Sequence, residues 1–159
     1  MRVAVGTDHG GFALREQVLA AVASLGHELV DVGATTYLGQ DDYPDYAEQL
    51  AQAILSGNAD RGILICGSGV GICIAANKFA GIRAAICHDT YSARQGVEDD
   101  AMNVLCLGGR VIGPELAGEI IRAFLAAEYK ALDRYERRKQ KVEAFEQAMT
   151  APKTGAARR

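Results

Sequence analysis

Short apolar runs alternate with longer amphipathic segments along most of the chain. Apolar stretches of strand length lie at residues 2–6, 28–32, 62–66, 83–87 and 103–107. Each is followed by a segment with apolar residues at helical spacing, beginning near residues 12, 44, 70, 89 and 114. Five strands alternating with five helices predict a parallel sheet that is covered on both faces. We therefore expect an α/β fold, a Rossmann-like three-layer α/β/α sandwich with a five-stranded parallel sheet.

An extra helix is predicted at the C-terminus, over residues 134–149. Its apolar stripe is thin, consisting of Val142, Phe145 and Met149, and the rest is strongly charged. Such a helix is too polar for a core, so we expect it to cover the site or a partner subunit. Residues 1–149 are predicted to form a single domain, and residues 150–159 a disordered tail.

Composition narrows the class of protein. The chain has 159 residues, of which 49% are hydrophobic and 23% charged, as in an ordinary globular domain. The net charge of −3 argues against nucleic-acid binding. No apolar run reaches the roughly eighteen residues of a membrane span, and no signal peptide is apparent. The four cysteines form no C-x-x-C pair, which predicts reduced thiols in a cytoplasmic protein.

The most informative stretch is the turn after the third predicted strand, where residues 66–71 read CGSGVG. A glycine-rich turn before a helix leaves backbone N–H groups free at the positive end of the helix dipole, where they can bind an anion. Cys66 ends the strand at that place, and the positive helix end favours its thiolate form. The stretch therefore combines a reactive sulfur with a cradle for an oxyanion.

The turn also has other interpretations. Its glycine spacing is G-x-G-x-G, which misses the dinucleotide fingerprint, and no Gly-Lys-Ser/Thr follows as in a P-loop. In the plainest alternative the glycines serve backbone geometry alone. Ligands of such folds bind at the carboxyl ends of the strands, where the strand order reverses. If strands one and three are neighbours, Asp8 and His9 converge with Cys66 and Ser68.

Several ordered motifs resemble one family. They are TDHGGF at residues 7–12, DYPDYA at 42–47, ICGSGVG at 65–71, AANK at 75–78, GIRA at 81–84, MNVL at 102–105 and GRVIG at 109–113. These stretches look like the ribose-5-phosphate isomerase B family, which also includes the galactose-6-phosphate isomerase subunits. The resemblance covers about residues 1–149.

The resemblance implies an aldose–ketose isomerase that interconverts ribose 5-phosphate and ribulose 5-phosphate without a cofactor. A proton would move between C1 and C2 through a cis-enediolate. Cys66 matches the family's base. The Ser68 hydroxyl and the backbone amides of the turn would stabilise the enediolate oxygen. Six further residues match substrate-binding positions of the family. They are Asp8, His9, Gly67, Gly69, Val70 and Gly71.

A phosphate group requires fixed cations, and arginine is the best geometric match. Arg110, Arg134 and Arg138 match the family's phosphate ligands. Without the resemblance, the basic residues near the C-terminus would be assigned to a solvated helix face. In the family, Arg110 and the residues near position 99 reach the pocket from a second subunit. A homodimer with shared active sites is therefore implied, and pairing of dimers into tetramers stays open.

The sequence departs from the family pattern at three positions. Asp99 stands where the family has the histidine assigned to opening the furanose ring, Asp100 stands for an asparagine, and Tyr135 replaces a second histidine. Either Asp99, His88 or a water takes over the acid–base role, or the substrate never closes a ring. A tetrose 4-phosphate cannot form a furanose, so erythrose or erythrulose 4-phosphate is an alternative substrate. A hexose 6-phosphate is another.

Three rival classes remain. A nucleotide-binding oxidoreductase would use Asp31 as its ribose-binding acid. A cysteine hydrolase would need a hydrogen bond between His9 and Cys66. A sugar-phosphate sensor would bind without catalysing proton exchange. The three histidines are too scattered to predict a metal site.

Overall fold

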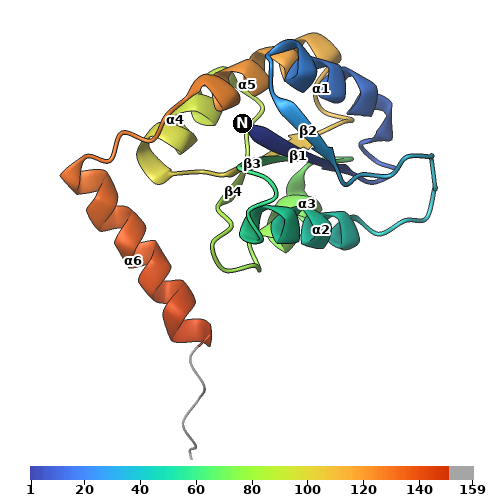
Figure 1. The fold of residues 1–159 in the computed structure, drawn as a ribbon. Coiled ribbons are helices and arrows are strands. Elements are labelled where there is room, and N and C mark those ends of the chain that lie inside the picture. Colours follow the sequence, from blue (N-terminus) through green and yellow to red (C-terminus); the bar gives the residue numbers. More distant parts are fainter. Residues whose placement is uncertain (151–159) are drawn as a thin grey trace, which may run out of the picture.

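The computed structural model describes residues 1–150 and contains one five-stranded parallel sheet (Figure 1). The strand order is β2-β1-β3-β5-β4. The strands are β1 Arg2–Thr7, β2 Glu28–Asp31, β3 Arg61–Cys66, β4 Ala84–Ile86 and β5 Val104–Gly108. The helices are α1 Phe12–Ser24, α2 Tyr43–Leu55, α3 Val70–Ala76, α4 Thr90–Asp100, α5 Pro114–Ala126 and α6 Asp133–Thr150.

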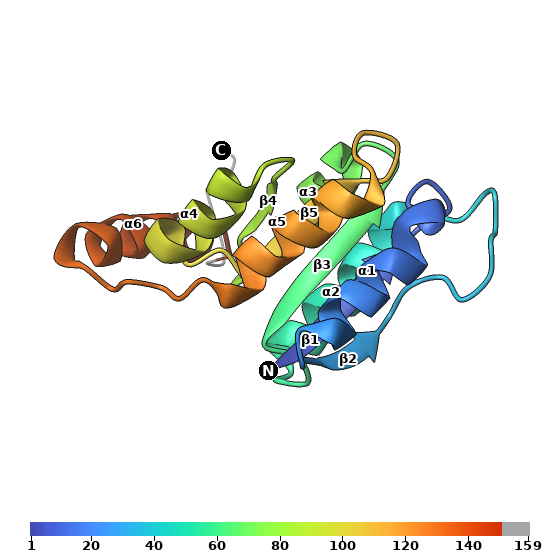
Figure 2. The same ribbon diagram turned by 90° about the horizontal axis from the view of Figure 1, so that it is seen from above.

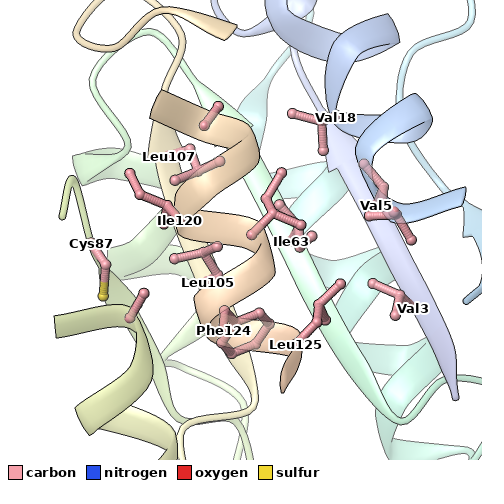
Figure 3. Close-up of a cluster of buried hydrophobic side chains, with 14 of the residues drawn as sticks. Val3, Val5, Val18, Ile63, Cys87, Leu105, Leu107, Ile120, Phe124 and Leu125 are labelled. Carbon is pink, nitrogen blue, oxygen red and sulfur yellow. The ribbon is translucent and has the colours of Figure 1, made fainter. Parts of the chain in front are cut away.

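The predicted three-layer sandwich is confirmed, with helices on both faces of the sheet (Figures 1 and 2). Helices α1, α4 and α5 bury one apolar cluster against the sheet, which includes Val18, Ile120 and Phe124 (Figure 3). Helices α2 and α3 bury a second cluster on the opposite face, which includes Leu50 and Ile72. Because both faces are covered, the central residues of β1, β3 and β5 are apolar in succession instead of alternating with polar residues.

Strand β3 is the centre of the sheet and pairs with β1 and β5. Its side chains alternate between the faces, as the pleat requires. Ile63 and Ile65 belong to the α1–α5 cluster, whereas Leu64 and Cys66 belong to the α2–α3 cluster. This alternation places the Cys66 side chain on the face that α2 and α3 cover.

Most predicted boundaries lie within one or two residues of the observed ones. Strand β4 is shorter than predicted, with three residues. Helix α3 is also short, with seven residues, and Asn77 caps its C-terminus. Helix α2 begins at Tyr43 with Pro44 in its first turn, where the missing N–H of proline costs nothing.

Helix α6 extends away from the sandwich beyond α4 (Figure 1). The N–H of Gly81 donates to Glu146 Oε2 at 3.0 Å. The apolar stripe of α6 is exposed, with 68% of Phe145 and 48% of Val142 accessible to solvent. The helix thus lies outside the core, and its expected role in covering the site or a partner subunit stays a prediction. The predicted tail lies outside the described residues, apart from Thr150, which ends α6.

None of the helices among residues 1–150 combines the length and apolar character that crossing a membrane would need.

The turn between β3 and α3 depends on Gly69. Its φ of +82° lies in the left-handed region that L side chains rarely adopt. A Cβ there would also lie 3.1 Å from the carbonyl carbon of Leu107, at the end of the neighbouring strand. Backbone conformation and close packing therefore both require glycine at the point where α3 begins.

We expect Gly69→Ala to lower the free energy of unfolding by roughly 1–3 kcal/mol, because the substitution forces alanine into a strained conformation against a strand. Gly118→Ala is the matched control, since Gly118 lies within α5 and a Cβ there meets no atom within 4 Å. That variant should gain about 0.5–1 kcal/mol from helix propensity. Urea denaturation measures both, and equal changes would contradict the assignment of strain to Gly69.

Candidate active site

A cavity of about 430 Å³ lies at the carboxyl ends of β1, β3 and β5. It is lined by Asp8, His9, Gly10, Tyr43, Cys66, Gly67, Ser68, Gly71, Arg110 and Val111. The chain leaves β1 toward β2 on one side and leaves β3 toward β4 and β5 on the other, so the strand order reverses here. Such a switch point is where ligands bind in open α/β sheets. The condition that strands one and three be neighbours is fulfilled.

The turns after β1 and β3 meet backbone to backbone. A Cβ on Gly10 would lie 2.7 Å from the amide nitrogen of Gly67, and a Cβ on Gly71 would lie 2.7 Å from the Tyr43 ring. A side chain at Gly10 would push the two turns apart, and one at Gly71 would displace the Tyr43 ring of α2. Glycine therefore brings the segment that carries Asp8 and His9 against the segment that carries Cys66.

Cys66 is 5% exposed, and its sulfur has a defined partner. The N–H of Gly69 donates to Cys66 Sγ at 3.1 Å, and the N–H of Val70 donates to Ser68 Oγ at 3.2 Å. These two amides are therefore engaged within the turn, so fewer of its amides can serve an oxyanion. Gly67, Ser68 and Gly71 are the residues of this turn that line the cavity.

Asp8 lies at the end of β1 and is 5% exposed. Its Oδ1 accepts the N–H of Gly11 at 3.0 Å. Burial raises the pKa of the Asp8 carboxyl, and the hydrogen bond from Gly11 offsets this only in part.

His9 is held by Asp41, a residue of the loop before α2. Asp41 Oδ1 accepts the backbone N–H of His9 at 2.9 Å and lies 2.7 Å from its Nδ1. The hydrogen bond to this carboxylate raises the pKa of His9. Burial by itself would raise the pKa of Asp41, but hydrogen bonds from His9 and Tyr46 outweigh it and lower that pKa.

Tyr46 completes the network from α2. Its hydroxyl donates to Asp41 Oδ2 at 2.9 Å. Burial and this hydrogen bond raise the pKa of Tyr46 to about 12, so it remains a donor. Sequence reasoning assigned no role to Asp41 or Tyr46. The available signal was an acidic pair, Asp41 and Asp42, in a loop that returns to the strand ends.

A cation would find one possible ligand group among residues 1–150. One ligand atom each of Asp8, His9 and Asp41 lies within 4.8 Å of the others. Sequence reasoning considered the scattered histidines and missed this cluster, because its second carboxylate comes from a distant loop. The carboxylate of Asp41 already accepts two hydrogen bonds from His9, so an ion bound there would have to displace one of them.

Arg110 lies in the cavity of its own chain. A Cβ on Gly67 would be 3.6 Å from Arg110 Cδ and Nε, and Arg110 N–H donates to the Gly67 carbonyl at 3.0 Å. The expectation that Arg110 comes from a second subunit is therefore wrong. The turn after β5 carries it to the switch point because β5 is the immediate neighbour of β3.

Asp99, Asp100, Arg134 and Arg138 do not line this cavity. Asp99 lies in the last turn of α4, where Gln95 Nε2 donates to its carboxylate at 3.0 Å and lowers its pKa. Asp100 and Arg138 line a separate groove between α6 and the α4 side of the sandwich. The guanidinium of Arg134 lies over the Tyr135 ring, 4.5 Å from its centroid. Four predicted site residues are thus gathered at α4 and α6, away from Cys66.

His88, a suggested replacement for the missing histidine, has another contact. Its Nε2 accepts the N–H of Gly108 at 3.0 Å, and it does not line the cavity. This hydrogen bond occupies Nε2 and turns it toward the backbone of β5. This geometry disfavours His88 as the replacement.

The requirements of two rival classes are also not met. Asp31 is ion-paired with Arg15 and accepts the N–H of Gly33 at 3.1 Å, so it serves the fold. His9 binds Asp41 through Nδ1, and no hydrogen bond joins it to Cys66 in the described part of the chain. Neither a ribose-binding acid nor a Cys–His pair is present in the form those classes need.

Comparison with known proteins gives consistent matches. Residues 3–142 match the family model described as Ribose/Galactose Isomerase. Ribose-5-phosphate isomerase B of Escherichia coli is 47% identical over 146 residues, covering 92% of this chain and 97% of that protein. D-erythrulose-4-phosphate isomerase of Pectobacterium atrosepticum is 45% identical over 130 residues, covering 82% and 86%.

A solved structure shares the fold. Ribose-5-phosphate isomerase B of Clostridium thermocellum superimposes with a TM-score of 0.90 at 41% identity, covering 94% of this chain and all of the other. The cavity at the switch point, the motifs that line it and these matches lead to one conclusion. The chain belongs to the ribose/galactose isomerase family.

Proposed function

We propose that this isomerase interconverts ribose 5-phosphate and ribulose 5-phosphate, a step of the pentose phosphate pathway. The observation that carries the proposal is the meeting of Cys66 with Asp8, His9 and Arg110 in one cavity. A thiol beside hydrogen-bonding groups and two cationic side chains suits an anionic sugar. The 47% identity to the Escherichia coli relative supports the pentose.

Cys66 is the proposed base. As a thiolate it removes the proton from C2 of the aldose. The electron pair of that C–H bond forms the C1–C2 double bond while the π pair of the C1 carbonyl moves onto O1, which gives a cis-enediolate. The same thiol then protonates C1, O2 becomes the carbonyl oxygen of the ketose and its proton passes to O1, so the reaction has no net change of oxidation state. The N–H of Gly69 donates to Sγ, a contact that suits a charged sulfur.

The developing enediolate oxygen needs hydrogen-bond donors that are already in place. The Ser68 hydroxyl and the amides of the turn are the proposed donors, since Gly67, Ser68 and Gly71 line the cavity. Asp8 is proposed to bind sugar hydroxyls. Asp99, an expected catalytic residue, would act from the second subunit together with Asp100.

We propose that the active form is a homodimer with shared sites. Arg110 serves the phosphate from its own chain, whereas α6 carries Arg134 and Arg138 away from the cavity of its own chain. The exposed stripe of α6, with Phe145 68% accessible, suits a helix that packs on a partner. Arg134 and Arg138 of the partner subunit would then complete the phosphate site.

A tetrose 4-phosphate is the second candidate substrate. Asp99 replaces the expected ring-opening histidine, and a tetrose 4-phosphate has no furanose ring to open. The Pectobacterium relative, named for D-erythrulose 4-phosphate, is 45% identical and nearly as similar as the Escherichia coli one. The chemistry at C1 and C2 is the same for either sugar.

We further propose that the enzyme is cytoplasmic. All four cysteines are free thiols, and Cys66 must stay reduced to act as a base.

Cys66→Ala should lower kcat for ribose 5-phosphate by about 10²–10⁴-fold, because it removes the base. Cys73→Ala is the matched control: it changes a cysteine of α3 outside the cavity and should stay within about threefold of the parent enzyme. Thiol alkylation is a poorer test, since contact with Cys106 lowers the pKa of Cys73 to about 7. Full activity of Cys66→Ala would refute the mechanism.

The substrate is decided by turnover of ribose 5-phosphate beside erythrulose 4-phosphate, each in deuterated water. We expect a higher kcat/KM for the pentose, with solvent deuterium incorporated into the product. A preference for the tetrose would transfer the assignment to the second candidate. Binding of both sugars with neither product formation nor deuterium incorporation would instead identify a sensor.

Shared sites predict complementation between two inactive variants. Cys66→Ala lacks the base, and Arg134→Ala/Arg138→Ala should lose at least about 30-fold in kcat/KM because phosphate charge is lost. After equal amounts are dissociated and mixed, half of the dimers carry one intact site, so about a quarter of the parent activity should return. If each site belongs to one chain, mixing will restore nothing.

A further inference from the structure

Asp41 is the strongest feature that the proposed reaction leaves unused. It belongs to the loop between β2 and α2 and does not line the cavity. Only 9% of its side chain is exposed. One oxygen accepts two hydrogen bonds from His9, and the other accepts one from Tyr46. A carboxylate with three donors on it is held firmly.

The protonation of His9 follows from this geometry. An ionised carboxylate only accepts hydrogen bonds, so the nitrogen 2.7 Å from Asp41 Oδ1, which is Nδ1, must carry a hydrogen. The ring therefore keeps Nε2 for a ligand. When the ring is neutral, Nε2 is an acceptor, and when the ring is charged, Nε2 is a donor.

The ring is restrained from a further direction. Tyr37, in the same loop as Asp41, meets it edge-on with ring centroids 6.4 Å apart, and Tyr37 also packs edge-on against Phe12. The His9 backbone is fixed by its own N–H bond to Asp41. Position and orientation of the imidazole are thus set together.

We propose that Asp41 is a positioning residue that fixes His9 and keeps its Nε2 a charged donor for an anionic oxygen of the substrate. This inference rests on the proposed function, in which His9 belongs to the sugar-phosphate site. Asp41 acts through His9 and does not touch the substrate. Tyr46 holds Asp41 in turn.

The charges around His9 come from several elements. Asp8 precedes it, Asp41 and Tyr37 come from the loop before α2, Tyr43 and Tyr46 from α2, Cys66 from β3 and Arg110 from the turn after β5. The hydrogen bond to Asp41 is the largest influence, and it raises the pKa of His9. The imidazolium therefore persists to higher pH than it would beside a neutral residue.

The test is Asp41→Asn, which keeps an acceptor for Nδ1 and removes the charge. NMR titration of the His9 ring should show a lower pKa than in the parent protein. KM for the sugar phosphate should rise about 3–10-fold at a pH between the His9 pKa values measured for the two proteins. It should rise much less at a pH below both values, where the His9 ring is charged in the parent and in the variant. The value of kcat should change by less than about twofold, because the base is untouched.

Asp42→Asn is the matched control. It removes the neighbouring carboxylate, which is exposed and makes no side-chain capping bond to α2, so the His9 titration and KM should not change. Tyr46→Phe keeps the charge of Asp41 but removes its anchor, and should shift the His9 titration in the same direction by a smaller amount. It also serves if Asp41→Asn does not fold.

An unchanged His9 titration in both Asp41→Asn and Tyr46→Phe would overturn the proposal. So would a KM that rises by the same factor at every pH, which indicates lost structure. Loss of parent activity in a chelator, restored by a divalent ion, would make Asp41 a metal ligand instead. The titration needs no turnover: if it shifts while no sugar phosphate is isomerised, the proposed function fails and the positioning of His9 by Asp41 stands.

Discussion

The close approach of two glycine turns is the constraint on which the rest of the site depends. The pairing of β1 with β3 brings Thr7 beside Ile65, so the turns that follow start at the same edge of the sheet. Gly10 and Gly67 then let the backbones touch, since a Cβ on Gly10 would lie 2.7 Å from the Gly67 amide. If the two turns lay farther apart, Cys66 would face solvent, and Cys66 and His9 could not contact the same ligand. The close packing of the two turns is therefore what brings the side chains of the site together.

In the described part of the chain, the expected site residues lie in two separate regions. Cys66, His9 and Arg110 meet at the switch point, while Asp99, Arg134 and Arg138 gather near α4 and α6. Sheet order explains the division, because β5 borders β3, whereas the α4 helix follows the edge strand β4. A helix such as α6, with a thin exposed apolar stripe and little contact with its own sandwich, gains stability chiefly by packing on another surface. Symmetric association would bring the two regions together without any change in the fold.

The imidazole of His9 is held by a second residue, Asp41, which is held in turn by Tyr46. The carboxylate is largely shielded and hydrogen-bonded, so its charge acts on the imidazole with little screening by water. Burying a charged carboxylate has a cost, and this cost raises the pKa of Asp8. Its hydrogen bond from Gly11 only partly offsets the burial. The two carboxylates lie close together and differ because only one of them is paired with a cation.

Local pattern was enough to predict the elements, the α/β class and the importance of the CGSGVG turn. Apolar runs, proline at helix starts and glycine at turns are properties of neighbouring residues, and Gly69 carries its left-handed φ at the place where the sequence indicates a turn. The motifs likewise led to the family. The partners of Cys66 and His9 were decided by the tertiary structure. Asp41 is 32 residues from His9, and Arg110 reaches its own cavity because of strand order. Such contacts depend on how the whole sheet is assembled, since no periodicity along the chain records which strand ends come to lie together.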